Sequence, residues 1–167
     1  MRHQGRIQLS ATHAVLPIKK AYVFDVDTPK AECFAKGISE LLEMNVVATI
    51  DLMRATKESD VCVTCTPSRR YYIENGHVSP GTFIAAMGAD SPDKQELDPE
   101  LLKSSRVVVD ILEPCAQVGE LHRALARGMR KEDVHAELGE IVAGKKPGRT
   151  NEEEIIIFDG QKLRFRM

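Results

Sequence analysis

The chain has 167 residues, 43% of them hydrophobic and 29% charged, which suits one domain with a substantial core or one lobe of a larger protein. Its 23 basic and 25 acidic residues give a formal net charge of −2, which argues against nucleic acid as the main partner. No apolar run approaches the roughly 20 residues that span a membrane, and the residues after Met1 are polar, unlike a signal peptide. We therefore expect a cytoplasmic protein with no membrane or nucleic-acid partner.

Segments with apolar residues at helical spacing alternate with short, continuous apolar runs. In chain order these patterns predict a helix at 4–15, a strand at 20–25, a helix that Thr28 caps with Pro29 in its first position, a strand at 46–49, a helix at 51–59, strands at 60–66 and 83–87, a helix at 99–103, a strand at 106–110, helices at 113–126 and 131–142, and a strand at 154–158. Continuous apolar runs between helices are typical of buried parallel strands. The sequence therefore predicts an α/β fold with a doubly wound parallel sheet.

Two cysteines, Cys62 and Cys65, have the spacing of a redox pair or of half a zinc site. Both lie in a predicted strand, where an odd spacing directs the two side chains to opposite faces. No second cysteine pair is present, and the five histidines are scattered without zinc-ligand spacing. We therefore predict no metal site.

An acid follows closely on the apolar run 83–87, which ends in Gly88 and is followed two residues later by Asp90. Glycine allows a ligand to approach the backbone closely, and open α/β sheets bind ligands at the carboxyl ends of their strands. Asp90 is thus placed as a working carboxylate. It is equally placed to start a turn through Ser91 and Pro92, and position alone leaves both interpretations open.

A second acid, Asp25, lies where a dinucleotide-binding fold needs a carboxylate for the adenosine ribose, at the end of a strand and 21 residues beyond Gln4. Asp27 competes for that role, and Asp25 could also simply end its strand. An acid in this place favours NAD over NADP, because a 2′-phosphate would meet a like charge. We expect Asp25, Thr66 and Asp90 at one edge of the sheet, at the carboxyl ends of their strands.

Three ordered segments resemble the ornithine cyclodeaminase/mu-crystallin family, which includes alanine dehydrogenases. They are Met-Gly-Ala-Asp-Ser-Pro-Asp-Lys-Gln-Glu-Leu-Asp-Pro-Glu-Leu-Leu at 87–102, the stretch 134–159, and Gln-Gly-Arg-Ile-Gln-Leu-Ser-Ala at 4–11. The resemblance implies a Rossmann-like NAD(P)-binding domain in an enzyme, usually a dimer, that acts on a small L-amino acid. Hydride would pass from the amino acid to NAD, leaving an imine, as in an oxidoreductase or a cyclodeaminating lyase.

The resemblance also implies roles for individual residues. Asp90 matches the family's catalytic carboxylate. The positions that match cofactor contacts are Gln4, Asp25, Thr66, Met87, Gly88 and Lys94. Lys94 could equally be a solvated surface lysine.

The family's strand and Gly-x-Gly turn would precede Gln4, where this chain has only Met1, Arg2 and His3. We therefore expect residues 1–167 to form a single, partial dinucleotide-binding domain without its first strand and without the family's N-terminal substrate and dimerisation domain. Such a domain would self-associate or cover its open strand edge, and by itself would be inactive. The alternatives are a truncated, non-catalytic nucleotide-binding fragment and a mu-crystallin-like binding or structural protein.

Overall fold

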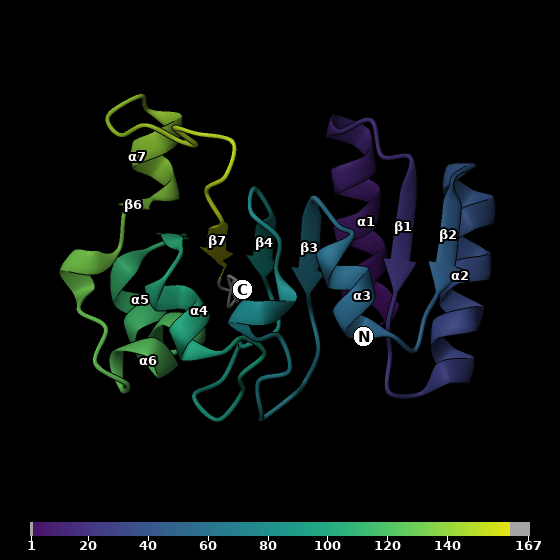
Figure 1. The fold of residues 1–167 in the computed structure, drawn as a ribbon, viewed down its shortest axis with the longest axis horizontal. Coiled ribbons are helices and arrows are strands. Elements are labelled where there is room, and N and C mark those ends of the chain that lie inside the picture. The colour runs from purple at the N-terminus through teal and green to yellow at the C-terminus, as the bar shows by residue number, and fades with distance from the viewer. Residues whose placement is uncertain (1, 161–167) are drawn as a thin grey trace, which may run out of the picture. The chain divides into compact units, whose positions relative to one another are not determined.

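The computed structural model describes residues 2–160, and the chain divides into two compact units, Met1–Glu58 and Ser59–Met167. Each unit is an α/β arrangement with its own parallel sheet (Figure 1). The predicted α/β class with parallel strands is confirmed, and the strands are divided between two sheets. The units are described in turn.

The first unit has a two-stranded parallel sheet and three helices. Its elements are α1 (Arg2–Val15), β1 (Lys20–Val23), α2 (Thr28–Leu42), β2 (Asn45–Ala48) and α3 (Leu52–Lys57). Helix α2 packs against both strands, and it buries Ala31, Ala35 and Ile38 at helical spacing. The helix follows β1 and leads into β2, as expected for parallel strands, which need a crossover connection.

The start of α2 differs from the prediction by one residue. Asp27 is the cap, because its backbone is extended and its side chain accepts a hydrogen bond from the N–H of Lys30 at 3.2 Å. Thr28 is the first helical residue, and Pro29 therefore follows in the second position rather than the first. Aspartate is as good a cap as threonine, so the local pattern did not discriminate between them.

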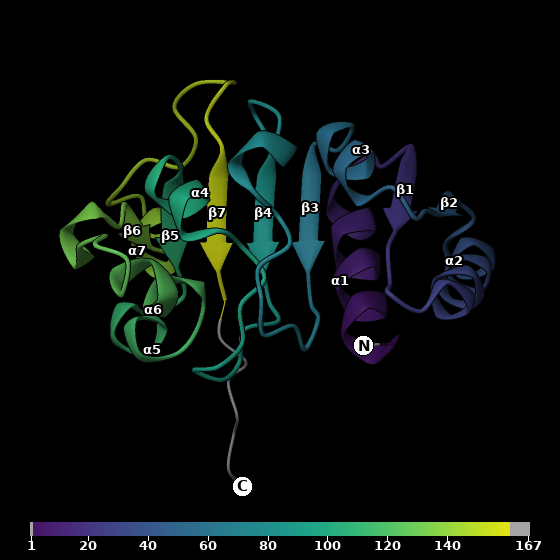
Figure 2. The same cartoon turned by 60° about the horizontal axis from the view of Figure 1, so that its bottom comes forward.

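The second unit has a five-stranded, fully parallel sheet in the order β3-β4-β7-β5-β6 (Figure 2). The strands are β3 (Val61–Thr64), β4 (Phe83–Ala86), β5 (Arg106–Val109), β6 (Ala136–Glu137) and β7 (Ile156–Asp159). The helices are η1 (Asn75–His77), α4 (Pro99–Lys103), α5 (Leu112–Gln117), α6 (Glu120–Leu125), η2 (Lys131–Asp133) and α7 (Leu138–Val142), where η denotes a 3₁₀-helix.

The last strand of the chain is central to this sheet. β7 lies between β4 and β5, and Ile157 is paired with Ile84 on one side and with Val107 on the other. All five strands are parallel, so their carboxyl ends lie at one edge. The segments that follow β3 and β4 are thereby brought together at that edge.

Two predicted helices are wrong. The segment 113–126 is interrupted at Gly119, whose φ of 118° is far from helical, so it forms α5 and α6 instead of one helix. In the segment 131–142, the N–H of His135 donates to the carbonyl of Val107 at 2.9 Å, and Ala136 pairs with Val108 of β5. Pairing with the sheet therefore replaces the middle of the predicted helix with β6 and leaves only η2 and α7.

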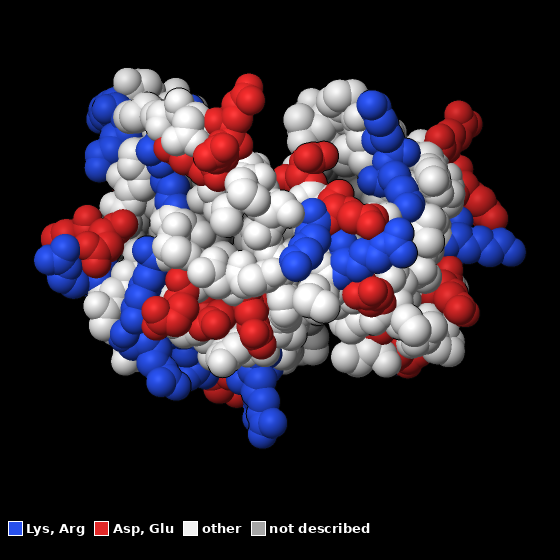
Figure 3. Space-filling model, in the orientation of Figure 1, with Lys and Arg blue, Asp and Glu red and all other residues white. Residues whose placement is uncertain are grey.

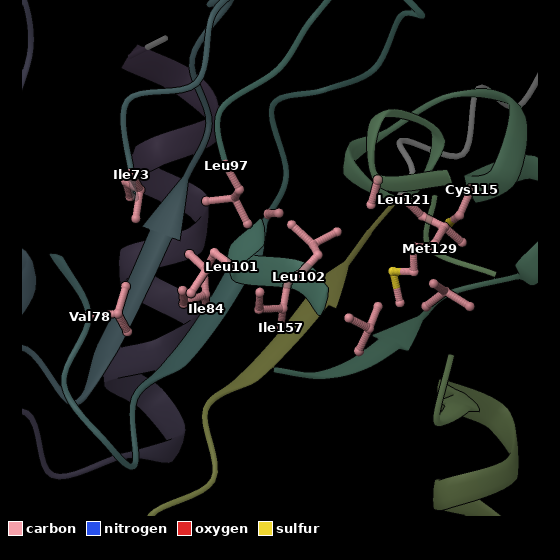
Figure 4. Packing of buried hydrophobic residues seen from close by; sticks show 14 residues of the cluster. Ile73, Val78, Ile84, Leu97, Leu101, Leu102, Cys115, Leu121, Met129 and Ile157 are labelled. Atoms are coloured by element: carbon pink, nitrogen blue, oxygen red, sulfur yellow. The ribbon is translucent and has the colours of Figure 1, made fainter. Parts of the chain in front are cut away.

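The core of the second unit lies between its sheet and helices α4 to α6 (Figure 4). Leu101 and Leu102 of α4 are fully buried, as are Ile84 of β4 and Ile157 of β7 in the same cluster. Leu121 and Cys115 bring α6 and α5 into the same cluster. The apolar runs that were predicted to be buried strands therefore form the sheet side of the core.

Acidic and basic side chains are interspersed over the face drawn in Figure 3, and neither sign gathers into one extended patch there. Among the described residues, no helix is both long and apolar enough to cross a membrane.

Candidate functional site

The carboxyl edge of the five-stranded sheet carries most of the predicted site residues. Thr66 lies two residues beyond β3, and Met87 and Gly88 directly follow β4. The N–H of Met87 donates to the carbonyl of Thr64 at 2.8 Å, so the pairing of β3 with β4 continues up to the edge. The structure thus brings Thr66, Met87 and Gly88 together, as the strand-end argument predicts.

A buried carboxylate that the sequence analysis did not single out joins these two strand ends. Glu96 is fully buried, and its Oε1 accepts hydrogen bonds from the N–H and the hydroxyl of Thr66, both at 2.6 Å, and from the hydroxyl of Tyr72 at 3.0 Å. Its Oε2 accepts from the N–H of Gly88 at 3.0 Å. One side chain therefore holds the turns after β3 and β4 in a fixed relation.

Gly88 is required by this arrangement. A Cβ atom at position 88 would lie 2.3–2.5 Å from the atoms of the Glu96 carboxyl group, closer than real Cβ contacts. We expected the glycine to allow a ligand near the backbone, and that use stays a prediction. The structure adds a second reason, which is that only glycine leaves room for the Glu96 carboxylate.

The backbone around Glu96 is held from two further directions. The carboxyl group of Glu120, on α6, accepts from the N–H of Glu96 at 2.7 Å and from the N–H of Leu97 at 3.2 Å. The carbonyl of Glu96 accepts from the N–H groups of Tyr72 and Ile73 at 3.0 and 3.2 Å. Both the side chain and the backbone of Glu96 are therefore held in place at this edge.

Asp90 and Lys94 form an ion pair within the loop that joins β4 to α4. Their side chains are only 17% and 24% exposed, so Lys94 is not a freely solvated surface lysine. The same loop contains a turn in which the N–H of Lys94 donates to the carbonyl of Ser91 at 3.0 Å. The turn therefore starts at Ser91, next to Asp90, while the Asp90 carboxylate pairs with Lys94. The role of Asp90 as a working carboxylate stays a prediction.

Two other buried acids lie beneath the edge, and burial raises the pKa of each. The pKa of Glu120 rises to about 8, although the N–H groups of Glu96 and Leu97 oppose the shift. Burial raises the pKa of Asp159, the last residue of β7, to about 7, opposed by hydrogen bonding to the N–H of Leu121 at 2.9 Å. Both groups therefore titrate near neutral pH.

The thiol of Cys62, in β3, has a raised pKa. Burial, and then the nearby charge of Glu96, raises the pKa of Cys62 to about 12, so the thiolate is scarce at neutral pH. Burial likewise raises the pKa of Tyr72 well above its usual range. Within residues 2–160, no group of three histidine, cysteine or acidic side chains is arranged to hold a metal ion.

The first unit contains the other two predicted cofactor contacts. Gln4 lies near the start of α1, and Asp25 lies two residues beyond β1. The Asp25 carboxylate accepts from the N–H of Asp27 at 3.0 Å, while Asp27 caps α2. Asp27 therefore serves the turn and the helix. The ribose contact by Asp25, and its place at one edge with Thr66 and Asp90, stay predictions.

The sequence analysis missed the roles of four residues at this edge, namely Tyr72, Glu96, Glu120 and Asp159. The sequence indicated Glu96 only as part of the segment 87–102. Its position directly before Leu97 and the helix cap Asp98 was a weak signal of burial. Asp159 ends an apolar strand, which is the same signal that singled out Asp25. Glu120 stands beside Gly119 with no local pattern that indicates its burial.

These features define a parallel α/β unit of the Rossmann type, with polar groups collected at the carboxyl ends of its strands. The chain belongs to the ornithine cyclodeaminase/mu-crystallin family, whose sequence profile matches residues 3–163.

Among curated proteins, the chain is similar to alanine dehydrogenase from Archaeoglobus fulgidus, with 40% identity over 161 residues that cover 96% of this chain and 49% of that protein. It is also similar to iminosuccinate reductase from Paracoccus denitrificans, with 36% identity over 95% of this chain and 48% of that protein. The chain spans about half the length of the curated relatives it matches.

Solved structures agree with this assignment. The Δ1-pyrroline-2-carboxylate reductase of Thermococcus litoralis, solved with NADH and L-proline, superposes with a TM-score of 0.92 at 34% identity, covering 95% of this chain and 50% of that chain. An archaeal alanine dehydrogenase dimer with bound NAD gives a TM-score of 0.90 at 40% identity, covering 96% of this chain and 49% of that chain. The predicted family and Rossmann-like fold are confirmed.

Proposed function

We propose that this chain is the NAD-binding part of an enzyme that oxidises a small L-amino acid at its α-carbon, or reduces the corresponding imine. The observation that carries the proposal is the cluster of Thr66, Gly88 and the Asp90–Lys94 pair at one edge of a parallel sheet. Family membership supports it, since the relatives include an alanine dehydrogenase and an iminosuccinate reductase.

Each unit offers residue types that suit a part of a dinucleotide. Asp25 supplies a carboxylate at a strand end, the type of group that binds a ribose diol, and its charge favours NAD over NADP. In the second unit, Thr66 offers a hydroxyl beside its strand end, and Met87 and Gly88 offer backbone. Gln4 and Lys94 complete the proposed cofactor contacts. When bound, NAD supplies the hydride acceptor.

Asp90 is the proposed acid–base group. Proton transfer at the substrate nitrogen, or at the water or amine that adds to the imine, needs a carboxylate shielded from bulk water. Asp90 is mostly buried and forms an ion pair with Lys94. The same carboxylate would serve dehydrogenation, imine reduction and cyclodeamination, because each reaction includes a proton transfer at the α-nitrogen of the substrate.

As an isolated polypeptide, the 167-residue chain is proposed to bind NAD weakly and to lack turnover. The 167 residues span about half the length of the curated relatives they match, so part of the cofactor contacts of a complete enzyme is expected to come from outside them. Each charge-assisted hydrogen bond that these residues do not supply costs about 1.5–3 kcal/mol, and about 1.4 kcal/mol is tenfold in affinity. A dissociation constant in the millimolar range is therefore expected. A dimer, as in the archaeal alanine dehydrogenase, is the proposed assembly of the complete enzyme.

The test is an NMR titration of the ¹⁵N-labelled chain with NAD and, separately, with NADP. We expect concentration-dependent shifts of the amides of Thr66, Gly88 and Asp25, with weaker binding of NADP. D25N should reduce the preference for NAD, because it removes the charge that repels a 2′-phosphate. E58Q is the matched control, since Glu58 is an exposed acid of the same unit that pairs with Arg54. Absence of shifts at Thr66 and Gly88 would refute the proposal.

A further inference from the structure

Two of the proposed cofactor contacts, Thr66 and Gly88, are 22 positions apart in the sequence and lie on separate strand ends. The Glu96 carboxylate accepts from both, with one oxygen on each side. Both bonds come from backbone N–H groups, which can only donate. The two carboxylate oxygens must therefore both act as acceptors, which an amide side chain cannot reproduce.

The same carboxylate closes the loop that contains the proposed acid–base group. The bond from the N–H of Gly88 to Oε2 of Glu96 joins the two ends of the segment 88–96, and Asp90 and Lys94 lie between them. Glu120 then holds the far end of this segment through the N–H groups of Glu96 and Leu97. The path of the loop thus depends on where Glu96 is anchored.

Charge pairing does not explain the position of Glu96. Within residues 2–160, no lysine or arginine forms an ion pair with it. A buried carboxylate is stabilised only if its oxygens are satisfied, and here four accepted hydrogen bonds do so. Two of its donors, Thr66 and Gly88, belong to the proposed site. A change in the position of the Glu96 carboxylate would therefore change the positions of these two residues.

We infer that Glu96 is a positioning residue, which ties the turns after β3 and β4 into one platform at the proposed cofactor site and sets the path of the loop that carries Asp90. The use of this platform for a cofactor rests on the proposed function. The hydrogen bonds that join the two turns do not depend on any ligand. Glu96 itself does not touch the substrate in this proposal.

The experiment compares the full chain with E96Q by amide hydrogen exchange and by titration with NAD. Glutamine keeps the size of the side chain, but its NH₂ group meets an N–H donor at either Thr66 or Gly88. At least one of these two amides should therefore exchange about tenfold faster or more, which corresponds to about 1.4 kcal/mol, while the amides of Val107 and Val108 in β5 are unaffected. The dissociation constant for NAD should rise at least about threefold.

E154Q is the matched control. Glu154 is also a poorly exposed acid with several donors, and it binds Arg106 and Thr150 at the opposite, amino end of β5. E154Q should lower the temperature of unfolding but leave the exchange of Thr66 and Gly88 and the affinity for NAD as in the parent chain. If Glu96 had only a structural role, E96Q would behave like E154Q, with a lower temperature of unfolding but unchanged exchange and NAD affinity. Comparing the two variants therefore distinguishes a positioning role from a contribution to stability alone.

Unchanged exchange at both Thr66 and Gly88 in folded E96Q would overturn the inference, and so would unchanged NAD affinity if the parent chain binds NAD. If the parent chain shows no binding, the proposed function fails, and the exchange data still decide the geometric inference. If E96Q does not fold, Y72F replaces it. Tyr72 donates to Oε1 and Gly88 to Oε2, so a shifted Gly88 amide resonance supports transmission through Glu96, and an unshifted one refutes it.

Discussion

Glu120 provides the most direct test of the electrostatics beneath the site. Burial raises its pKa from 4.5 to about 8, and Glu120 holds the N–H groups of Glu96 and Leu97. The perturbation that we consider is E120Q. Glutamine matches the size of the protonated acid and remains neutral at every pH, so it removes the titration and preserves most of the packing.

The sign of the effect follows from proton binding. Between pH 4.5 and 8, Glu120 holds a proton in the folded protein and loses it in the unfolded chain, so the folded state is favoured at the acidic end of that window and loses stability as pH rises. Each unit of pKa shift is worth about 1.4 kcal/mol, so this single group accounts for a loss of up to about 5 kcal/mol across the window. That is a large part of the roughly 5–15 kcal/mol that stabilises a domain.

The assay is urea unfolding followed by circular dichroism at several pH values from 5 to 8. The free energy of unfolding of the parent chain should fall with pH. E120Q should start about 1 kcal/mol below the parent at pH 5, because the amide NH₂ of glutamine faces the N–H of Leu97, 3.2 Å from Glu120 Oε2. It should then show a shallower slope and become the more stable protein by pH 8.

D133N is the control for this series. The exposed Asp133 has a pKa lowered by its hydrogen bond to Arg130, so any stability it contributes is lost only as pH falls below the usual range of a carboxyl group. D133N should retain the slope of the parent chain between pH 5 and 8. The reasoning is refuted if the parent chain gains stability from pH 5 to 8, or if E120Q keeps the full slope of the parent.

The remaining predictions concern packing and activity. G88A should lower the free energy of unfolding by about 1–3 kcal/mol, because its Cβ would overlap the Glu96 carboxylate, whereas G139A in α7 meets nothing within 4 Å and should be neutral or slightly stabilising in thermal melts. Equal melting temperatures of the two variants would contradict the packing argument. L101A, at a fully buried position of α4, should cost about 2–5 kcal/mol in urea unfolding, and a cost below about 1 kcal/mol would show that the cluster is loosely packed. The 167-residue chain should form no NADH with NAD and alanine, ornithine or proline, as followed by NADH absorbance, and any sustained NADH formation would show that the proposed lack of turnover is wrong.

Local sequence patterns were sufficient for most of the secondary structure and for placing candidate residues at strand ends. The apolar runs at 83–87 and 106–110 are continuous and short, and they form β4 and β5 within a residue of the prediction. A glycine and an acid after such a run mark a strand end wherever the strand lies in the sheet. This is why Gly88 and Asp90 could be located at a strand end before the fold was known, whereas Thr66 was singled out by the family resemblance. The family itself could be recognised from segments such as 87–102.

Pairing between distant segments could not be read from the same patterns. Nothing near 131–142 indicates that Ala136 will pair with Val108, and the helical spacing of that segment is overridden by the hydrogen bonds it gains in the sheet. The central position of β7, between β4 and β5, is likewise a property of the whole sheet. The residues 156–159 alone do not indicate it.

What the sequence determined by itself was the class of fold, the family, and the strand ends at which the proposed chemistry is placed. Only the tertiary structure decided that Glu96, Glu120 and Asp159 are buried under that edge, because the fate of an acidic side chain depends on which N–H groups the folded chain brings to it. The residue type is the same for an acid exposed to water and for a buried acid that joins two strands. The donors that distinguish them come from residues up to 38 positions away, at which distance local pattern carries no information.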